Sequence, residues 1–448
     1  MPEKNEKILL TIESLDSELR GVAHPGGLTV FVPGALPGEE VEALIVKKEK
    51  RCAFAKVLRI MKESGERVPP ACPYYAQCGA CCGLHMTYQS TLQAKQDNVA
   101  QVMRRIGGIQ CPVRPVIGME NPDHYRNKTA MPVAMADGRA CCGYFAPRSH
   151  RLVRVDDCLM SRKESMILNR VVLDWMGDYA IPPYDEQTKS GLIRHILTRV
   201  SQRGESMLCL CAASNEIPHT KELCERAFAQ VQGLVSVCLT VNAKGDNVIL
   251  GNSYTVLRGQ KRLSDRLCGL DFDLSPLSFF QINPLQTEKL YALALEFAGL
   301  QGREQVFDLY CGAGTISLML ARHCAHVTGI EIVPQAIADA RENARKNGIE
   351  NADFYAGAAE KILPEMIKEG QRADVIVLDP PRKGAEIQVL QAILTAAPER
   401  IVYVSCDPAT LARDLKILSD GYRVCALQPV DMFCRTAHVE TVALLCKK

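Results

Sequence analysis

The sequence predicts an α/β protein in which a doubly wound parallel sheet follows two smaller domains. Its 448 residues are enough for two or three domains. From about residue 271 onward, short apolar runs alternate with helical segments, as is typical of a parallel sheet. We therefore expect a small β-barrel over residues 1–62, an α+β domain over residues 63–270 and the α/β domain over residues 271–448.

The first domain is predicted from short apolar runs that Gly and Pro separate. These runs are Ile8–Ile12, Leu28–Val32, Val41–Val46 and Ala53–Ile60. Four or five short strands with Gly/Pro turns favour a barrel of the oligonucleotide-binding kind. A basic cluster that includes Lys47, Lys56 and Arg59 accompanies the last run. A generic β-module without a nucleic-acid partner explains this pattern nearly as well.

Overall composition points to no partner. Lys and Arg number 53, and Asp and Glu number 51, so net charge does not indicate binding to a polyanion. No apolar run approaches 18 residues and no apolar segment opens the chain, which predicts a cytoplasmic protein that does not cross a membrane. The 20 cysteines of such a chain favour reduced thiols, metal ligation or catalysis over disulfides.

Three cysteines near the start of the second domain predict a metal site. Cys72, Cys78 and Cys81 are separated by five and two residues, among Gly and Pro. Cys158 is the best candidate for the fourth ligand, and Cys82 and Cys141–Cys142 are competitors. A site of four thiolates suits zinc or an iron–sulfur cluster equally well. The spacing therefore indicates a metal site without deciding the metal.

The rest of the second domain is less regular. A helix is expected over Thr87–Arg105, with Thr87 as its N-cap and Gly107–Gly108 as its end. Residues 110–270 mix short strands and helices without a repeat. Tyr125–Lys128 and His195 lie here, and each is more readily explained as structural than as functional.

The third domain has the clearest pattern. The predicted strands are Gln305–Tyr310, His326–Glu331, Ala352–Ala356, Ala373–Asp379, Arg400–Ser405, Tyr422–Leu427 and Val439–Cys446. The clearest helices are Pro334–Asn347, which Gly348 ends, and Pro408–Ser419. Because no helix separates the last two strands, we expect an antiparallel strand at the edge of the sheet.

Cys406 is a candidate nucleophile because of its place in this pattern. It follows the buried strand Arg400–Ser405, and Asp407-Pro408 open a helix directly after it. The carboxyl ends of such strands form the usual ligand crevice of an open α/β sheet. A helix N-terminus also lowers the pKa of a nearby thiol. From position alone, a nucleophile and a buried core cysteine are equally good interpretations.

Two further motifs face the same crevice. Asp308-Leu-Tyr-Cys-Gly312-Ala-Gly314-Thr315 follows the first strand, where its glycines let a ligand approach the backbone. Glu331 ends the next strand, where a carboxylate can bind both ribose hydroxyls. The turn lacks the third Gly of a dinucleotide fingerprint, so a nucleoside-type cofactor without a pyrophosphate is favoured. Asp379-Pro-Pro-Arg382 ends the fourth strand and lacks the aromatic that amine methylases carry next, which favours chemistry at a ring carbon.

These motifs resemble a known family. Asp308–Gly314, Asp379–Gly384, Ser405–Pro408 and His438–Glu440 are similar to motifs of the RNA uracil-5-methyltransferases. The N-terminal module is similar to that family's TRAM domain, an RNA-binding domain. Cys72, Cys78, Cys81 and Cys158 are similar to the [4Fe-4S] ligands of its 23S rRNA branch. The resemblance spans nearly the whole chain.

The resemblance implies a class I (Rossmann-like) S-adenosylmethionine methyltransferase domain and covalent catalysis. Cys406 would add to C6 of uracil, and Glu440 would remove the C5 proton. The cofactor residues that it implies, together with those of the glycine turn, are Gln281, Asp308, Tyr310, Gly312, Gly314, Thr315, Glu331 and Asp379. Ala358 departs from the family, which usually has an acid there for the adenine amine. The cluster would be structural, because methyl transfer needs no electron.

The substrate implied is a uridine of 23S rRNA, swung out of its stack. Phe279, Phe280 and Tyr125 are candidates for stacking on RNA bases, and each could equally be a core residue. One alternative is a tRNA uracil-54 enzyme, against which the metal loop and the β-module argue, since that branch generally lacks both. Another is a non-catalytic, metal-stabilised RNA-binding protein. No obligate protein partner is indicated.

Overall fold

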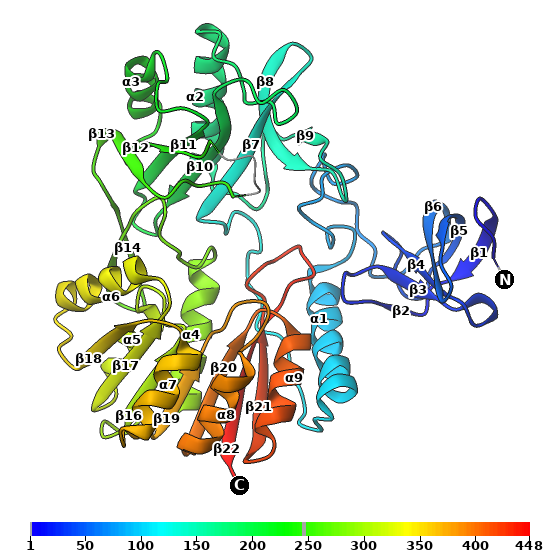
Figure 1. Cartoon of the computed structure of the whole chain (residues 1–448). Coiled ribbons are helices and arrows are strands. Elements are labelled where there is room, and N and C mark those ends of the chain that lie inside the picture. Colours follow the sequence, from blue (N-terminus) through cyan, green and yellow to red (C-terminus); the bar gives the residue numbers. More distant parts are fainter. Residues whose placement is uncertain (1, 244–247) are drawn as a thin grey trace.

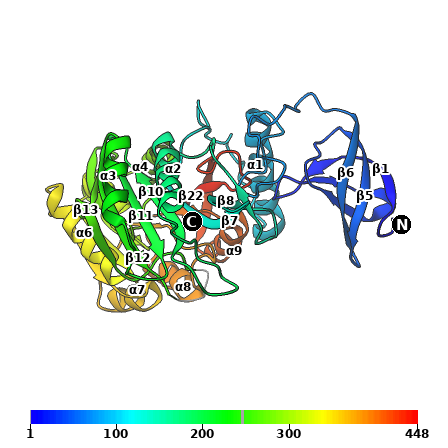
Figure 2. The same ribbon diagram turned by 90° about the horizontal axis from the view of Figure 1, so that it is seen from above.

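The computed structural model describes residues 2–243 and 248–448, which form three parts (Figure 1). A small β-module stands at one side, and two larger parts lie one above the other. Viewed from above, the β-module is set apart from the rest of the molecule (Figure 2). No helix within the described ranges is long and apolar enough to cross a membrane.

The β-module is one six-stranded sheet, in the order β1-β5-β6-β4-β3-β2. Its strands are β1 (Lys7–Thr11), β2 (Ser14–Leu15), β3 (Gly21–Ala23), β4 (Thr29–Val32), β5 (Glu40–Lys48) and β6 (Cys52–Lys62). Along β5, buried Val41, Ala43 and Ile45 alternate with more exposed residues, so a single face of the strand enters the core. The four predicted strands are present. The two others, β2 and β3, have only two and three residues, too few to show a period.

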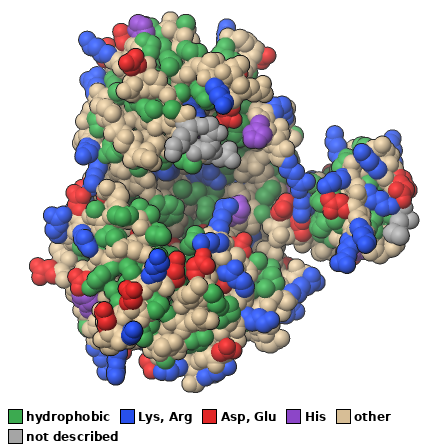
Figure 3. Space-filling model, in the orientation of Figure 1, with side chains coloured by type: hydrophobic (Ala, Val, Ile, Leu, Met, Phe, Trp, Pro, Cys, Tyr) green, Lys and Arg blue, Asp and Glu red, His purple; other side chains and the backbone are tan. Residues whose placement is uncertain are grey.

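The upper part contains a seven-stranded sheet, in the order β13-β12-β11-β10-β7-β8-β9. Its strands are β7 (Lys128–Ala136), β8 (Arg139–Phe145), β9 (Leu152–Arg154), β10 (Ile193–Val200), β11 (Ser206–Ala212), β12 (Leu234–Val241) and β13 (Tyr254–Gly259). Helices α2 (Lys163–Asp178) and α3 (Thr220–Gln230) cover one face, where Trp175 is completely buried. The other face looks toward the lower part, and the space between them is hollowed (Figure 3).

The lower part is the predicted doubly wound sheet, in the order β18-β17-β16-β19-β20-β22-β21. Its strands are β16 (Gln305–Leu309), β17 (His326–Glu331), β18 (Ala352–Ala356), β19 (Val375–Leu378), β20 (Arg400–Ser405), β21 (Tyr422–Val430) and β22 (Glu440–Lys447). Helices α4 (Pro284–Ala298), α5 (Thr315–Ala321) and α6 (Pro334–Lys346) pack on one face. Helices α7 (Ala359–Lys368), α8 (Ile387–Ala396) and α9 (Pro408–Leu418) pack on the other.

The position of the antiparallel strand differs from the prediction. β22 is antiparallel to its neighbours, as expected, but it lies between β20 and β21 rather than at the edge. Its sequence explains this, because Glu440–Ala443 are all buried and an edge strand would expose part of them. The expected edge strand is therefore wrong. Insertion of β22 next to β20 brings its first residue to the carboxyl end of the sheet.

Residues from the first half of the chain also pack on this lower sheet. Helix α1 (Tyr88–Val102) is capped by Thr87, whose side chain accepts from the Ser90 N–H. It continues into a short π-helical turn that ends at Gly108 in the left-handed conformation. Its Val99 joins the core formed by α7–α9. Val113 and Ile117 then form parallel bridges to β21, so this segment extends the sheet beyond its last strand.

A two-stranded hairpin, β14 (Leu263–Leu267) and β15 (Leu270–Leu274), joins the upper and lower parts. Its apolar side chains belong to the same core as α4 and α5.

Candidate active site

Cys406 lies at the carboxyl end of β20, directly before α9, as its sequence predicts. β20 is buried along nearly its whole length because β19 and β22 flank it and helices cover both faces. Cys406 itself is only partly buried. The strand therefore holds the residue rigidly while leaving its thiol open to a ligand.

The helix end does not activate this thiol in the way that the sequence suggested. Burial and the carboxylates of Glu440 and Asp379 raise the pKa of Cys406 to about 11, against an opposing effect of Arg382. The Asp407 side chain accepts from the N–H groups of Ala409 and Thr410, at 2.8 and 2.9 Å. This cap satisfies the first free donors of α9. The predicted lowering of the thiol pKa is wrong for the protein alone, because burial and the two carboxylates raise it.

Glu440 is brought to Cys406 by the pairing of β22 with β20. The antiparallel register pairs Ser405 with Thr441. Cys406, which follows Ser405, therefore stands opposite Glu440, which precedes Thr441. Glu440 is only 4% exposed, and burial followed by the charge of Asp379 raises its pKa to about 8. A carboxyl group with this pKa can exchange a proton near neutral pH.

Asp379 completes a group of acids at this edge. It follows β19, the strand beside β20, and burial raises its pKa to about 7. Arg382 follows the two prolines that come after Asp379. Its charge lowers the pKa values of both Cys406 and Glu440. The carboxyl ends of β19 and β20 and the amino end of the antiparallel β22 therefore contribute a thiol, two acids and a guanidinium to one place.

The glycine turn lies at the same end of the sheet, between β16 and α5. Gly312 and Gly314 have φ angles of 55° and 79°, the left-handed region that favours glycine. A Cβ at Gly314 would lie 3.1–3.2 Å from Ala340 and Phe354, so a side chain there would also crowd its neighbours. The Tyr310 hydroxyl is buried beside this turn and has no hydrogen-bond partner among the described residues.

The acids of the turn have different surroundings. Asp308 has no exposed surface, and one of its carboxylate oxygens accepts from Ser317 Oγ at 2.5 Å. Burial raises the pKa of Asp308 to about 7, and its position indicates that it supports α5 from beneath the turn. Glu331 is more exposed, and its carboxylate accepts from the N–H groups of Gly312 and Val333, at 3.2 and 2.9 Å. These bonds hold the Glu331 carboxylate against the turn.

The remaining predicted residues approach from other elements. Thr315 begins α5, and its Oγ1 lies 3.0 Å from the Tyr291 hydroxyl. The carbonyl of Gln281, in the loop before α4, accepts from Asn127 Nδ2 at 3.0 Å, which connects this loop to β7. Ala358 is the N-cap of α7 and offers no side-chain cap.

The three aromatic candidates for RNA contact differ in how much of each side chain is exposed. Phe280 and Tyr125 are each only 3% exposed and belong to the apolar cores. The Tyr125 hydroxyl also donates to the Cys434 carbonyl at 3.0 Å, which fixes it inside the protein. Phe279 is 76% exposed. It is therefore the candidate among these three that is free to stack on a base.

Comparison with known proteins shows the family to which this chain belongs. A family described as tRNA (Uracil-5-)-methyltransferase matches residues 87–448, and the TRAM domain matches residues 3–58. The chain belongs to the tRNA (uracil-5-)-methyltransferase family. The resemblance to the uracil-5-methyltransferases and to the TRAM domain is thereby confirmed.

Relatives in this family match along the whole chain. A protein of Clostridium tetani named an uncharacterized RNA methyltransferase is 43% identical over 99% of this chain and 97% of its own length. One of Halalkalibacterium halodurans with the same description is 45% identical over the same shares.

A solved structure corrects one argument about the substrate. The tRNA (uracil-54, C5)-methyltransferase of Pyrococcus abyssi, in complex with S-adenosyl-L-homocysteine, superimposes with a TM-score of 0.80. The match covers 98% of this chain and 100% of that one, at 24% identity, and shows a shared fold. Because that fold includes the N-terminal module, the expectation that this module distinguishes rRNA enzymes from tRNA-54 enzymes is wrong.

The four predicted metal-ligating cysteines line one cavity. Cys72, Cys78, Cys81 and Cys158 share it with Tyr74, Tyr75, Leu84, Tyr144 and Met160. Burial and the neighbouring thiols of Cys158, Cys78 and Cys72 raise the pKa of Cys81 to about 12. In the part of the chain that the structure describes, no three His, Cys, Asp or Glu side chains come close enough together to hold a single metal ion.

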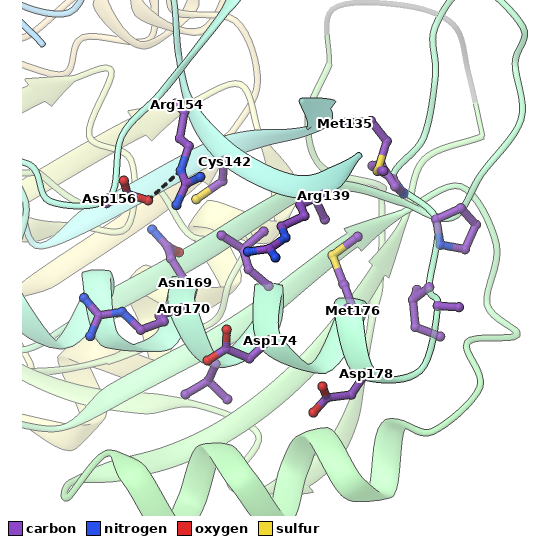
Figure 4. A pocket seen from close by; sticks show the side chains of 18 of the residues that line it. Met135, Arg139, Cys142, Arg154, Asp156, Asn169, Arg170, Asp174, Met176 and Asp178 are labelled. Atoms are coloured by element: carbon purple, nitrogen blue, oxygen red, sulfur yellow. Dashed lines mark hydrogen bonds and ion pairs between the residues drawn. The ribbon is translucent and has the colours of Figure 1, made fainter. Parts of the chain in front are cut away.

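The other cysteines that competed for this site point elsewhere. Cys142 lines a separate cavity of about 1330 Å³ between α2 and the β8–β9 region (Figure 4). Arg139, Arg170 and Asp174 surround this second cavity, which is not at the catalytic edge. Cys82 packs toward Leu19 and Met86.

Sequence reasoning missed residues 431–437 of the loop that leads into Glu440. The Asp431 carboxylate accepts hydrogen bonds from Lys95 Nζ at 2.5 Å and from the Tyr88 hydroxyl at 2.8 Å. The side chains of Lys95 and Asp431 are both fully buried. The Arg435 carbonyl accepts from the N–H groups of Cys82 and Gly83, next to the cysteine cavity. A local signal existed for Lys95, because it shares the buried face of α1 with Thr91 and Val99 at helical spacing. Its partner, 336 residues away, had no signal in the sequence.

Proposed function

We propose that the protein transfers a methyl group from S-adenosylmethionine to C5 of a uridine in RNA. The register of β20 and β22, which sets Cys406 opposite Glu440 beside Asp379, is the observation that carries this proposal. Together these side chains supply a nucleophile and a base at the carboxyl edge of an α/β sheet, where such folds bind ligands.

The thiol of Cys406 acts first. As a thiolate it adds to C6 of uracil, and the C5–C6 π electrons move onto C5 and O4 as an enolate. C5 can then attack a methyl group, which it is too weak a nucleophile to do in free uracil. Since the thiol pKa is about 11 in the protein alone, a positive charge bound nearby would increase the fraction of thiolate.

Glu440 acts second. Its carboxylate takes the proton from C5, the electrons of that C–H bond restore the C5–C6 double bond, and the Cys406 thiolate leaves. Its buried position explains how a carboxyl group is basic enough for this step, since burial raises its pKa to about 8. Arg382 opposes that shift and so increases the fraction of carboxylate at any given pH.

The residues around the glycine turn fit the cofactor. S-adenosylmethionine, when bound, supplies an activated methyl group on a sulfonium. The left-handed turn at Gly312–Gly314 leaves room beside the backbone, and the unpartnered Tyr310 hydroxyl can receive a polar group. Glu331 retains lone pairs for the ribose hydroxyls, and Gln281, Thr315 and Asp379 complete the set. Asp308 supports the turn from below.

We propose 23S rRNA as the substrate and the cytoplasm as the place of reaction. The four-cysteine cavity supports the rRNA branch, whose members carry such a ligand set by resemblance. A tRNA uridine is the second candidate, because a tRNA (uracil-54, C5)-methyltransferase shares the fold over the whole chain.

We also propose that Cys72, Cys78, Cys81 and Cys158 hold a [4Fe-4S] cluster with a structural role. The four cysteines line one shared cavity, a donor set that suits zinc or an iron–sulfur cluster, and the resemblance to the rRNA branch favours the cluster. Brown protein with iron and sulfide supports the cluster, and colourless protein with stoichiometric zinc refutes it. Reductive loss of activity with fold and RNA binding intact would refute the structural role.

Methyl transfer from labelled S-adenosylmethionine to 23S rRNA fragments and to tRNA transcripts tests the function. Wild-type protein should methylate C5 of a uridine in one of these RNAs, and Cys406→Ala should not. Glu440→Gln should accumulate a denaturant-stable complex with methylated RNA, because the thiol cannot leave while the C5 proton remains. Unchanged turnover by Cys406→Ala would contradict the mechanism.

A further inference from the structure

Two cations stand directly opposite each other at the end of the upper sheet nearest the catalytic part. The antiparallel register of β7 and β10 pairs Lys128 with Arg199, so their side chains leave the same face of the sheet. Like charges at such positions repel each other and are destabilising in a sheet. Within residues 2–243 and 248–448, neither side chain forms an ion pair. The repulsion between Lys128 and Arg199 therefore lowers the stability of the folded protein, and no ion pair among the described residues offsets it.

The two cations differ in how deeply they are buried, and only Lys128 is within reach of a ligand. Arg199 is fully buried, and one of its guanidinium nitrogens donates to the Ser278 carbonyl at 2.7 Å. The acid whose charge acts on it is Asp265, whose Oδ1 accepts from the N–H groups of Gln202 and Arg266 and whose Oδ2 is buried without a hydrogen-bond partner. Lys128 is only partly buried. Burial and the charge of Arg199 lower the pKa of Lys128 to about 8, which an added anion would reverse.

The pair lies beside an exposed aromatic ring. Arg199 contacts Ser278, and Phe279, the next residue, is 76% exposed. Asn127, adjacent to Lys128, bonds to the backbone of Gln281 and Ile282 in the same loop. Lys and Arg side chains gather in the hollow between the upper and lower parts (Figure 3). A cation next to an exposed ring is the combination that proteins use for single-stranded nucleic acid.

We propose that Lys128 binds a phosphate of the RNA substrate, next to a nucleotide whose base stacks on Phe279. Arg199, sealed behind it, raises the positive potential at this position without touching the RNA. This inference rests on the proposed function, and it adds a site for one phosphodiester on the sheet of the upper part. The cofactor's carboxylate is disfavoured as the anion, because Lys128 belongs to that sheet and not to the turns of the lower one.

The test compares Lys128→Gln with wild type in binding to a uridine-containing RNA hairpin over a range of salt concentrations. Loss of one phosphate contact should weaken binding about 10-fold at low salt. It should also reduce the slope of log affinity against log salt by about 0.7–0.9. Lys221→Gln, an exposed lysine on α3 at the helix-covered face, is the matched control and should change neither quantity. Lys128→Arg should keep the slope.

Two further readouts separate this role from a structural one. Lys128→Gln should raise the melting temperature of the RNA-free protein, since it removes a repelling charge, and should leave S-adenosylmethionine affinity unchanged. RNA with a single neutral methylphosphonate should lose affinity for wild type at one position where Lys128→Gln shows no further loss. An unchanged salt slope, a lowered melting temperature or weakened cofactor binding would each overturn the inference. Because these are binding measurements, they distinguish its failure from failure of methyl transfer.

Discussion

At the scale of single residues, the catalytic edge is a group of acids whose protonation is controlled by burial. Glu440 has its pKa raised to about 8, so at pH 7 most of it carries a proton. The proposed base is active only as the carboxylate. We expect single-turnover methylation to increase with pH between about 7 and 9, and the contribution of Glu440 to this increase to level off above its pKa.

The control for this pH profile is Glu440→Gln, followed as formation of the covalent RNA complex instead of product. Formation of that complex does not use the base, so the inflection attributed to Glu440 should be absent. A wild-type rate that falls as pH rises through 8 would contradict the assignment.

The same burial should make the stability of the protein depend on pH. Asp308 and Asp379 have folded-state pKa values of about 7, and Glu440 of about 8, all above their values in an unfolded chain. The folded state then holds more protons between about pH 4 and 8, so its stability falls as pH rises through this window. Asp379→Asn should flatten the dependence of melting temperature on pH. A melting temperature that rises steadily from pH 5 to 8 would contradict this.

At the scale of elements, helix α1 holds the loop that leads to Glu440. The buried pair of Lys95 and Asp431 joins them, with Tyr88 as a third partner. Lys95→Met should destabilise the protein by about 3–5 kcal/mol, because it leaves the charge of Asp431 buried without a counterion. Denaturant unfolding measures this, and adding Asp431→Leu should recover part of the loss. A single variant as stable as wild type would show that the pair does not hold the loop.

At the scale of the whole molecule, the carboxylate of Glu39 fixes the β-module to the chain that follows it. It is fully buried and accepts from Arg67 and from the N–H groups of Leu36 and Ser64. Glu39→Gln should loosen the module, weakening RNA binding several-fold while leaving cofactor affinity unchanged. Small-angle scattering should show a wider range of dimensions. Equal loss of RNA and cofactor binding would indicate general unfolding instead.

The sequence predicted the parts of this fold that depend on local patterns. Strands such as Arg400–Ser405 and His326–Glu331 match in full because both faces of each are covered, and an unbroken apolar run then marks the strand. The position of Cys406 followed from that strand and from Asp407-Pro408. By contrast, the placement of β22 beside β20 and the packing of α1 on the lower sheet depend on contacts between distant segments. No local pattern records them.

The pKa of the Cys406 thiol is another property that the local sequence does not predict. The sequence contains the helix that would lower it and the Asp407 that caps this helix, but it does not show that burial would raise the thiol pKa. Nor does it show that Glu440 and Asp379 would raise the pKa by lying beside Cys406. Burial and the charges assembled by the fold outweigh the contribution that the adjacent helix makes.

The packing of α1 and residues 113–117 on the lower sheet has a consequence for how the chain folds. These residues leave the ribosome long before their partners on α9 and β21, which lie more than 300 positions later. Until then the apolar side chains of Val99 on α1 and of Met103 in the turn after it lack the partners that cover them in the folded protein. Closure of such distant contacts is slow, and uncovered apolar surface favours aggregation. Newly made chains of this protein should therefore depend on chaperones during synthesis more than the stability of the finished molecule would suggest.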